Sequence, residues 1–450
     1  MSPFRDTTAV AGTLFPRVII LPAEMRAILW ALYQIATTAI LAVAGPFLLV
    51  RRGKHYLPTL PGRLGLGKAE TDALGRGGLW IHAVSVGEVG VAATLARALP
   101  PEIPLVVTTV TPTGQARAQA LFKSRAAVAY LPFDLGFAAA RFFDRFQPRA
   151  LLLVEGDYWP LVLREARRRG LPVAVVNGRV GDRSFQRMRR LRPLLGPLFS
   201  AVGRFGVQSA ADRDRLVALG LPPERITVTG NLKYETPEPP PKPDLEERLR
   251  QLAAGRPILL AGSTMPGEEE QVIAAWEQAG GAARALLVLA PRHPERWNEV
   301  DALLRTRGLD VVRRSALPMT PARPGLVLLD SLGELASLYR LAAGAFIGGT
   351  LVPKGGHNPL EAARFGIPVA VGPSMENFRD MAEQFDRAGG WRRAADADAL
   401  GAVWKSWLDD PGAAREQGER AMRLVEENRG ALERTLAMLG AFHLLETPRP

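Results

Sequence analysis

Short apolar runs alternate with amphipathic stretches along most of the chain, and this alternation stops once and then restarts. The first series predicts a helix over 89–99 and strands over 79–84, 103–110, 151–154 and 173–176. The second series predicts strands over 258–261, 285–290, 326–329, 344–347 and 367–371. Such alternation is typical of parallel sheets covered by helices. The sequence therefore predicts an α/β protein with two Rossmann-like halves.

The interruption is the proline-dense stretch 236–244, which we expect to link the halves because proline disrupts helices and central strands. The predicted division is an anchoring segment (1–55), a first domain (56–235), the linker (236–244) and a second domain (245–450) that includes charged helices from about Pro411. Two such halves leave a cleft between the carboxyl ends of their strands, where ligands bind.

Composition limits the function. Cysteine is absent, which excludes disulfides and cysteine nucleophiles, and the five histidines lack the HExxH spacing of zinc sites. The net charge of +12 suits an anionic partner, either nucleic acid, phospholipid or a phosphorylated substrate. Without zinc-finger spacing, an aromatic RNA-binding motif or a basic tail, no nucleic-acid partner is expected.

Residues 28–50 are almost entirely apolar, and the run is long enough to cross a bilayer as a helix. Arg51, Arg52 and Lys54 follow at once, which favours a cytoplasmic location for the rest of the chain. Gly45 and Pro46 should weaken or kink the helix. A helix lying in the membrane surface and a buried core helix are the alternatives.

The stretch Lys354-Gly-Gly-His-Asn-Pro-Leu-Glu361 lies between two predicted strands and reads as a glycine-rich turn running into a helix. We expect Asn358 and Glu361 in its first turn, with free backbone N–H groups and a helix N-terminus suited to phosphate. An ordinary tight connection is the alternative.

Carboxylates follow two strands of the first half. Glu88 is predicted at a helix start after the turn at Gly87, where the helix dipole favours the anion that could accept a proton. Serving the dipole alone is the alternative. Glu155 and Asp157, beside Trp159, suit sugar hydroxyls or a pair with shifted pKa values, unless they merely cap a helix.

Basic residues of the first half suit phosphate. Lys233 follows Gly230-Asn231 at the predicted hinge and can act as a point charge. The segment 184–199 interleaves arginines with large apolar residues, which suits a membrane surface or a phosphorylated lipid. A solvated basic helix face is the alternative.

Strand ends of the second half carry small hydroxyls, an arginine and a carboxylate, in the runs 262–264, 291–294 and 330–335. Hydroxyls and arginine are anion ligands by type. The first half carries the candidate base, so the sequence suggests a half that binds a nucleotide donor and a half that binds an acceptor.

Taken in order, these motifs resemble the 3-deoxy-D-manno-octulosonic acid (Kdo) transferases of lipopolysaccharide assembly, over nearly the whole chain. The motifs that carry the resemblance are His82-Ala-Val-Ser-Val-Gly-Glu88, Leu131-Pro-Phe-Asp134, Gln208-Ser209, Gly230-Asn-Leu-Lys233, Arg292-His-Pro-Glu-Arg296 and Gly355-Gly-His-Asn-Pro-Leu-Glu361.

The resemblance implies a GT-B glycosyltransferase with two Rossmann-like domains facing a cleft and an N-terminal membrane-anchoring helix. It implies inverting, metal-independent transfer of Kdo from CMP-Kdo to a phosphorylated lipid A precursor of the lipid IV-A type, without a cofactor. The enzyme would work at the cytoplasmic face of the inner membrane. Residues 56–235 would then bind the acceptor, and residues 245–450 would bind the donor.

The resemblance also implies roles for individual residues. The expected catalytic residues are Glu88, Glu155, Asp157 and Lys233. The expected CMP-binding residues are Ser263, Thr264, Pro291, Arg292, Gly333, Glu334, Leu335, Asn358, Pro359, Leu360 and Glu361. The expected acceptor-binding residues are Ser85, Gly87, Arg179, Arg187, Arg189 and Arg190, and no metal ligand is expected.

The sequence departs from the family pattern at three places. Asp157 replaces a glutamate, Tyr234-Glu235 replaces Phe-Asp, and Met265-Pro266 replaces His-Glu. The carboxylate exchanges keep charge and shift reach by one methylene, and the lost histidine removes one possible ligand. The alternatives are a GT-B enzyme with another nucleotide-sugar donor, a sugar-nucleotide epimerase, and a membrane-bound binding protein whose catalysis has decayed.

Overall fold

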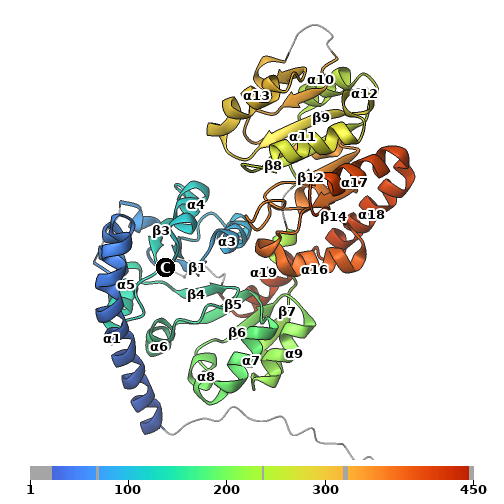
Figure 1. Ribbon diagram of the computed structural model, residues 1–450. Helices are drawn as coiled ribbons and strands as arrows, with labels where there is room; N and C mark the ends of the chain where they lie inside the picture. The colour runs from blue at the N-terminus through green and yellow to red at the C-terminus, as the bar shows by residue number, and fades with distance from the viewer. Residues whose placement is uncertain (1–22, 67–69, 236–237, 318–322, 445–450) are drawn as a thin grey trace, which may run out of the picture. The chain divides into compact units, whose positions relative to one another are not determined.

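A computed structural model describes residues 23–66, 70–235, 238–317 and 323–444 (Figure 1). The chain divides into two compact units. Unit 1 comprises residues 1–235 and 430–450, and unit 2 comprises residues 236–429. Each unit contains one parallel sheet of seven strands. The predicted α/β class with two Rossmann-like halves is therefore confirmed.

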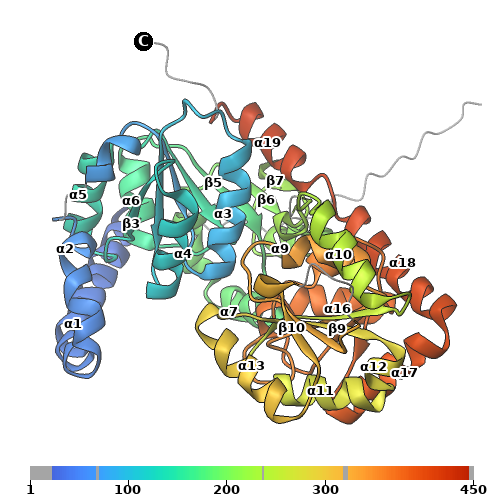
Figure 2. The ribbon, with the colours of Figure 1, turned by 90° about the horizontal axis from the view of Figure 1, so that it is seen from above.

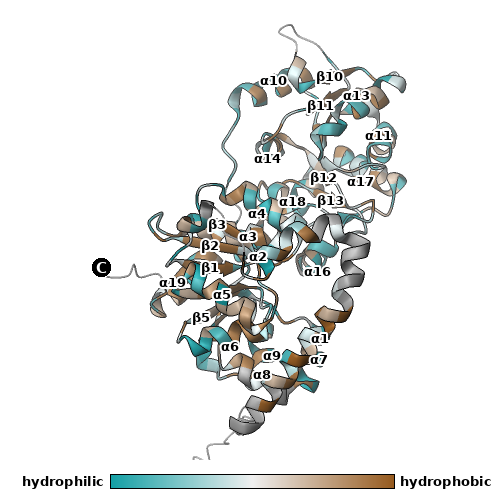
Figure 3. Ribbon diagram, turned by 90° about the vertical axis from the view of Figure 1, so that its left-hand side faces the viewer, coloured by the Kyte–Doolittle hydropathy of each residue, from teal (hydrophilic) through white to brown (hydrophobic). Residues whose placement is uncertain are grey.

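The sheet of unit 1 has the strand order β3-β2-β1-β4-β5-β6-β7. The strands are β1 (Leu79–His82), β2 (Leu105–Thr109), β3 (Ala127–Tyr130), β4 (Ala150–Val154), β5 (Val173–Gly178), β6 (Arg204–Val207) and β7 (Ile226–Val228). Strands β1, β2, β4 and β5 are buried along their whole length, as expected where helices cover both faces of a parallel sheet. Figure 3 shows the neighbouring strands β1 and β2 as mainly hydrophobic.

Side chains on the two faces of this sheet form separate cores. On one face, residues such as Ile81 pack with α3 (Val86–Ala98), α4 (Pro112–Phe122) and α19 (Ala431–Ala441). On the other face, Trp80 packs with α5 (Gly136–Phe146), α6 (Pro160–Arg168) and α8 (Arg192–Phe199). Figure 2 shows α3 and α4 on one side of the strands and α5 and α6 on the other.

The sheet of unit 2 has the strand order β10-β11-β9-β8-β12-β13-β14. The strands are β8 (Ile258–Thr264), β9 (Leu286–Pro291), β10 (Val311–Arg313), β11 (Leu326–Leu328), β12 (Gly344–Ile347), β13 (Val369–Val371) and β14 (Arg392–Arg393). One face is covered by α11 (Glu269–Gln278), α13 (Trp297–Thr306) and α17 (Ala397–Asp409), with Trp276 and Trp404 in the core.

The remaining helices complete the two units. They are α1 (Ala23–Tyr56), α2 (Leu60–Arg63), α7 (Asp182–Arg190) and α9 (Ala210–Ala218) in unit 1, and α10 (Pro243–Ala253), α12 (Gly281–Arg284), α14 (Leu335–Leu338), α15 (Leu360–Ala363), α16 (Arg379–Ala388) and α18 (Pro411–Glu427) in unit 2. The 3-10 helices are η1 (Leu57–Thr59), η2 (Glu70–Leu74), η3 (Pro223–Arg225), η4 (Leu232–Tyr234), η5 (Pro294–Arg296), η6 (Arg314–Ala316), η7 (Tyr339–Leu341) and η8 (Glu376–Phe378).

Helix α1 contains the predicted apolar segment and continues through Gly45 and Pro46. It is attached to unit 1 by Tyr33, whose hydroxyl donates to Asp134 (2.7 Å). The other oxygen of Asp134 accepts from the N–H groups of Leu161 and Val162 at the start of α6. Within the described ranges, no helix is both long enough and apolar enough to cross a membrane.

Three boundaries differ from the prediction. The described residues from Gly430 onward group with unit 1, because α19 packs on the core of that unit, whereas the sequence assigned them to the second domain. The linker is shorter than 236–244, since Pro243 begins α10, at a position where the missing N–H of proline costs nothing. Gly87, expected in the turn before the first helix, already belongs to α3, which begins at Val86.

Strand order defines one switch point in each sheet. In unit 1 the connections leave β1 and β4 in opposite directions, and in unit 2 the same occurs at β8 and β12. In open α/β sheets, ligands bind outside the carboxyl ends of the strands at such points. The loops after β1 and β4, and the loops after β8 and β12, are therefore the first places to look for functional groups.

Candidate active-site residues in the two units

In unit 1, Glu88 lies in the first turn of α3, directly after β1. Ser85 is the N-cap of this helix, and its hydroxyl oxygen accepts from the Glu88 N–H (3.5 Å). In return, the Glu88 carboxylate accepts from the Ser85 hydroxyl (2.8 Å) and from the Val84 N–H (2.8 Å). This reciprocal capping explains why the side chain is held at the carboxyl end of the sheet.

Burial is the main reason why the pKa of Glu88 rises to about 7 from its ordinary value of 4.5. The hydrogen bonds from Val84 and Ser85 lower it, and the carboxylates of Glu155 and Asp157 raise it again. A group with a pKa near neutrality can take up and release a proton under physiological conditions. Glu88 therefore has the chemistry of a general base, in addition to its capping role.

Glu155 and Asp157 follow β4, on the other side of the switch point. Partial desolvation and the Glu155 carboxylate raise the pKa of Asp157. Glu155 forms an ion pair with Lys233 (2.7 Å), which lies in η4. The structure thus brings together all four predicted catalytic residues, Glu88, Glu155, Asp157 and Lys233.

Asn177, at the end of β5, connects these groups and was not predicted as a site residue. Its amide nitrogen donates to Glu155 (3.3 Å), and its side-chain oxygen accepts from the N–H of Leu232 (2.8 Å), next to Lys233. Glu155 (φ 62°) and Asn177 (φ 55°) both have left-handed backbones, which is unfavourable for side chains other than glycine. Such strain often accompanies functional sites.

A buried histidine supports the loop after β4. Trp159 donates its ring N–H to Nε2 of His82 (2.9 Å), so the other ring nitrogen carries the proton and donates to Thr108 (2.9 Å). Burial lowers the pKa of His82 to about 4, which keeps the ring neutral. The two partners are 77 residues apart, so no local pattern of residues indicates this contact.

The predicted acceptor-binding residues fall into two groups. The first group consists of Ser85, Gly87 and Arg179, which follow β1 and β5. They lie at the same edge of the sheet as the four predicted catalytic residues. Arg187, Arg189 and Arg190 lie on α7, where all three are exposed while Phe185 packs into the core. A surface pocket beside this helix is lined by Arg183, Arg187, Arg190, Asp182, Gln186 and Leu191. No described hydrogen bond or ion pair joins this arginine cluster to Glu88.

In unit 2, several predicted donor residues lie near the switch point. Ser263, with a left-handed backbone (φ 58°), and Thr264 end β8, and Pro291 ends β9. Arg292 is exposed, and its backbone N–H donates to the Thr264 carbonyl (2.9 Å). Thr264 is buried, and its hydroxyl donates to Glu269. Contrary to the prediction, this hydroxyl is therefore not free to bind an anion.

The glycine-rich loop before α15 differs from the prediction. Three of its N–H groups are not free: Gly355 donates to Ser374, Gly356 to Gly349 and His357 to Gly348. Leu360 N–H donates to the side chain of Asn358, which precedes the helix and does not lie in its first turn. Pro359 is the N-cap, and Glu361 lies in the first turn of a helix of four residues, too short for an appreciable dipole.

His357 was not predicted to be a site residue. Its Nε2 atom is buried, and no hydrogen-bond partner for it is present among the described residues. Burial is the main cause that lowers its pKa to about 4, and the charges of Arg292 and His293 add to the effect. The charge of Arg292 is thus close enough to His357 to disfavour protonation of its ring.

The predicted run Gly333, Glu334 and Leu335 lies at the start of α14, where Glu334 is the N-cap but makes no capping hydrogen bond through its side chain. Burial raises the pKa of Glu334, but hydrogen bonds from Arg314 (both 2.9 Å) and Ser331 outweigh this and lower it. The carboxylate is thus already paired, and a nucleotide would have to compete with Arg314 for it.

A family model described as 3-Deoxy-D-manno-octulosonic-acid transferase (kdotransferase) matches residues 59–236. The 3-deoxy-D-manno-octulosonic acid transferase of Haemophilus influenzae is 34% identical over 81% of this chain and 87% of its own length. That of Bordetella pertussis is 35% identical over 86% of this chain and 93% of its own length. The chain belongs to this family. It is therefore a glycosyltransferase.

Solved structures share the fold. Anabaena HepE in complex with UDP has a TM-score of 0.51 at 11% identity, covering 81% of this chain and 99% of that protein. A putative UDP-N-acetylglucosamine 2-epimerase from Listeria monocytogenes has a TM-score of 0.50 at 16% identity, covering 83% of this chain and 98% of that protein. At such low identity these structures show the shared GT-B-like α/β fold and do not indicate an epimerase activity.

Proposed function

We propose that this family member moves Kdo from CMP-Kdo to a phosphorylated lipid A precursor of the lipid IV-A type, with inversion and without a metal ion or other cofactor. The observation that carries the proposal is the state of Glu88, a buried carboxylate with a pKa of about 7 at the switch point of unit 1. The sugar class follows from the family, since both bacterial relatives are named Kdo transferases.

In the proposed reaction, Glu88 accepts the proton of an acceptor hydroxyl while that oxygen attacks the anomeric carbon of the donor. One C–O bond forms as the bond from the sugar to CMP breaks, and CMP leaves as an anion. A single displacement inverts the anomeric centre. Positive charge that develops on the sugar ring is favoured by the neighbouring carboxylates of Glu155 and Asp157.

Cationic side chains would stabilise the departing CMP. Lys233 and Arg292 carry positive charge. Such preorganised groups stabilise developing negative charge more effectively than water does. This supports chemistry without a metal. In this proposal, cationic side chains take the role of phosphate binding that the sequence analysis assigned to the N-terminus of the helix now labelled α15.

The exposed arginines of α7 are suited to the phosphates of the acceptor lipid, because arginine binds phosphate through paired hydrogen bonds. Helix α1 supports attachment to the membrane surface. Its exposed apolar side chains are Ile28, Leu32, Ile35, Ile40 and Val43. We propose that α1 and α7 bind the cytoplasmic face of the inner membrane together, with α1 lying in the interface.

A transfer assay tests the proposal. The detergent-solubilised protein is incubated with lipid IV-A and with CMP-Kdo generated in situ, and the lipid mass is followed by mass spectrometry. A gain of one or more Kdo units is the expected result, and it should persist in EDTA. No gain, in a sample that CMP nevertheless protects against thermal unfolding, would refute the acceptor. No gain and no protection would refute the donor as well.

A further inference from the structure

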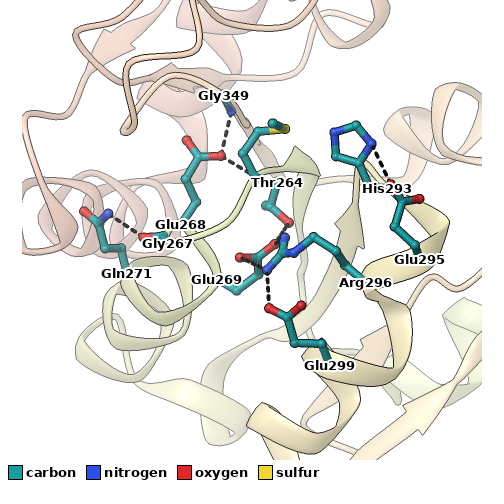
Figure 4. A network of polar contacts seen from close by, with 11 residues as sticks. Thr264, Gly267, Glu268, Glu269, Gln271, His293, Glu295, Arg296, Glu299 and Gly349 are labelled. Carbon is teal, nitrogen blue, oxygen red and sulfur yellow. Dashed lines mark hydrogen bonds and ion pairs between the residues drawn. The ribbon is translucent and has the colours of Figure 1, made fainter. Parts of the chain in front are cut away.

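Two adjacent glutamates, Glu268 and Glu269, lie where β8 connects to α11, and both are completely buried. Burying a carboxylate is unfavourable unless hydrogen bonds or an opposite charge compensate for it. The two side chains find their compensation in different loops of unit 2. Figure 4 shows Glu268 beside Gly349, and Glu269 beside Thr264 and Arg296.

Glu268 is bound by four backbone N–H groups. One carboxylate oxygen accepts from Met265 (2.9 Å) and Gly349 (2.6 Å), and the other accepts from Thr350 (2.9 Å) and Leu351 (2.8 Å). Successive N–H groups such as those of 349–351 form a concave nest that binds anions. In this protein the nest after β12 holds a carboxylate of the protein itself.

Burial raises the pKa of Glu268 overall, although the four N–H donors lower it. A protonated carboxyl group would have to direct its O–H toward one of these donors, which leaves a clash in place of a hydrogen bond. We therefore take the anion to be the form that this nest binds.

Glu269 reaches the other loop. It accepts from the Thr264 hydroxyl (3.0 Å) and forms an ion pair with Arg296 (2.7 Å), a residue of η5. The carbonyl of Thr264 in turn accepts the backbone N–H of Arg292 (2.9 Å). Glu269 thus holds both ends of the short segment that presents Arg292.

The loop held by Glu268 supports His357. A side-chain carbon added to Gly349 would lie 3.1 Å from the His357 ring, so the ring rests directly on this glycine. The His357 N–H also donates to the carbonyl of Gly348 (3.2 Å). One carboxylate therefore positions the loop under His357, and its neighbour positions the segment that carries Arg292.

We propose that Glu268 and Glu269 are positioning residues that hold the loops after β12 and β9 in the arrangement that binds the phosphate of the nucleotide-sugar donor. The inference rests on the proposed function for the identity of the ligand. It also implies that the N–H groups of 349–351 do not contact the donor phosphate. The exposed side chain of Arg292 remains for that contact, whereas the Nε2 atom of His357 is buried.

Chemical rescue tests this role, since Glu268→Ala deletes a group of about the size of acetate and leaves the nest empty. We expect kcat/KM for CMP-Kdo to fall about 10²-fold, the scale of a misplacement of about 1 Å. Saturating acetate should raise kcat/KM of this variant at least about tenfold. Neutral acetamide, which has the same shape, should leave kcat/KM unchanged, because the nest selects anions. The control is Glu270→Ala, at an exposed position of the same helix. It should leave both kcat/KM and the response to acetate as in the wild type.

Hydrogen exchange measured by mass spectrometry reads the same loop without any substrate. Peptides covering 348–356 should exchange faster in Glu268→Ala than in the wild type, and acetate should slow them again. If the alanine variant does not fold, Glu268→Gln is used instead. Its side-chain NH₂ group would face two backbone N–H donors and could not accept from them, so a similar fall in kcat/KM is expected. A glutamine variant with wild-type kinetics would overturn the proposal.

The failure of this inference can be told apart from failure of the proposed function. If the wild type transfers no Kdo, the proposed function fails, while the exchange measurement still decides whether Glu268 holds the loop. If the wild type transfers Kdo but the alanine variant neither responds to acetate nor exchanges faster in 348–356, the positioning role is wrong.

Discussion

Glu88 in unit 1 and Glu268 in unit 2 occupy corresponding places in their sheets. Each is a buried carboxylate (8% and 0% exposed) in the loop or first turn that follows the strand at the switch point. Their hydrogen-bond partners differ. Glu268 accepts four backbone N–H groups, whereas Glu88 accepts one backbone N–H and one hydroxyl.

In the proposed mechanism, this difference separates a carboxylate that positions a loop from one that accepts a proton. An ionised carboxylate has about four acceptor positions, and all four are used in Glu268. Glu88 keeps acceptor positions for a substrate proton, and its neighbours Glu155 and Asp157 raise its proton affinity. Burial alone therefore does not identify a catalytic acid or base; the number of fixed donors around it decides.

The strongest test of the comparison is Glu88→Gln. Glutamine keeps the size of the side chain but cannot accept a proton, so we expect the rate of Kdo transfer to fall about 10²–10⁴-fold, the usual contribution of a general base. The affinity for CMP, measured by calorimetry, should change little. Glu102→Gln, an exposed substitution in the same unit, is the control. Transfer within a few-fold of wild type would remove Glu88 from the mechanism.

Lys233→Met probes the charge that opposes Glu155. Loss of the 2.7 Å ion pair leaves Glu155 without its cation and removes a positive group from the site. We expect kcat to fall by about 10²-fold, as when one stabilising group for a developing anion is lost. The matched control is Lys405→Met, which breaks an exposed ion pair with Asp409 in unit 2 and should leave kcat unchanged. Equal effects of both substitutions would contradict the assignment.

The pH dependence of the rate should report Glu88 and not Glu268. Since Glu88 must be ionised to accept a proton, kcat/KM should rise about tenfold per pH unit below a pKa of about 7 and level off above it. The rising limb should move when Asp157→Asn removes a neighbouring charge, and a profile flat between pH 5 and 8 would disagree with the raised pKa.

The same shift has a defined sign for stability. The pKa of Glu88 is about 7 when folded and 4.5 ordinarily, so its contribution to stability is most favourable below pH 4.5 and declines as the pH rises through 7. Glu88→Gln should therefore gain stability relative to wild type between pH 4 and pH 8, by about 3 kcal/mol at 1.4 kcal/mol per pKa unit. Urea unfolding at both pH values measures this difference.

The smallest expected effect concerns His82, a buried group that supports the site without taking part in it. His82→Leu removes the acceptor of the Trp159 ring N–H and the donor to Thr108. We expect a loss of about 1–3 kcal/mol in the free energy of unfolding, the cost of unsatisfied buried groups. Gln119→Leu, at an exposed position of α4, should stay within about 0.5 kcal/mol.

Much of the fold could be predicted because long apolar runs are local signals. The strands expected at 151–154, 258–261 and 344–347 are all present. The strands that were missed are short or polar and lie mostly toward the sheet edges, such as β14 with its two arginines and β10 with three residues. At an edge, one neighbouring strand is enough to form the ladder, so the sequence need not be strongly apolar.

The candidate site divides in the same way. Ser85 and Glu88 are three residues apart, and a capping pair at this spacing can be recognised in a sequence. The use of the glycine-rich loop could not be recognised, because its N–H groups bond to Ser374, Gly349 and Gly348. A turn pattern indicates that N–H groups converge but does not indicate what they bind.

Periodicity, proline and ordered motifs were enough to predict the class of fold, a linker beginning at residue 236 and the family, but not that the described residues from Gly430 onward belong to unit 1. The different numbers of hydrogen bonds received by Glu88 and Glu268, on which their proposed roles rest, could be seen only in the folded chain. The three nest donors of Glu268 in the β12 loop are 81 to 83 residues away along the chain. Hydrogen bonds over such separations arise from strand order, which no local pattern of residues encodes.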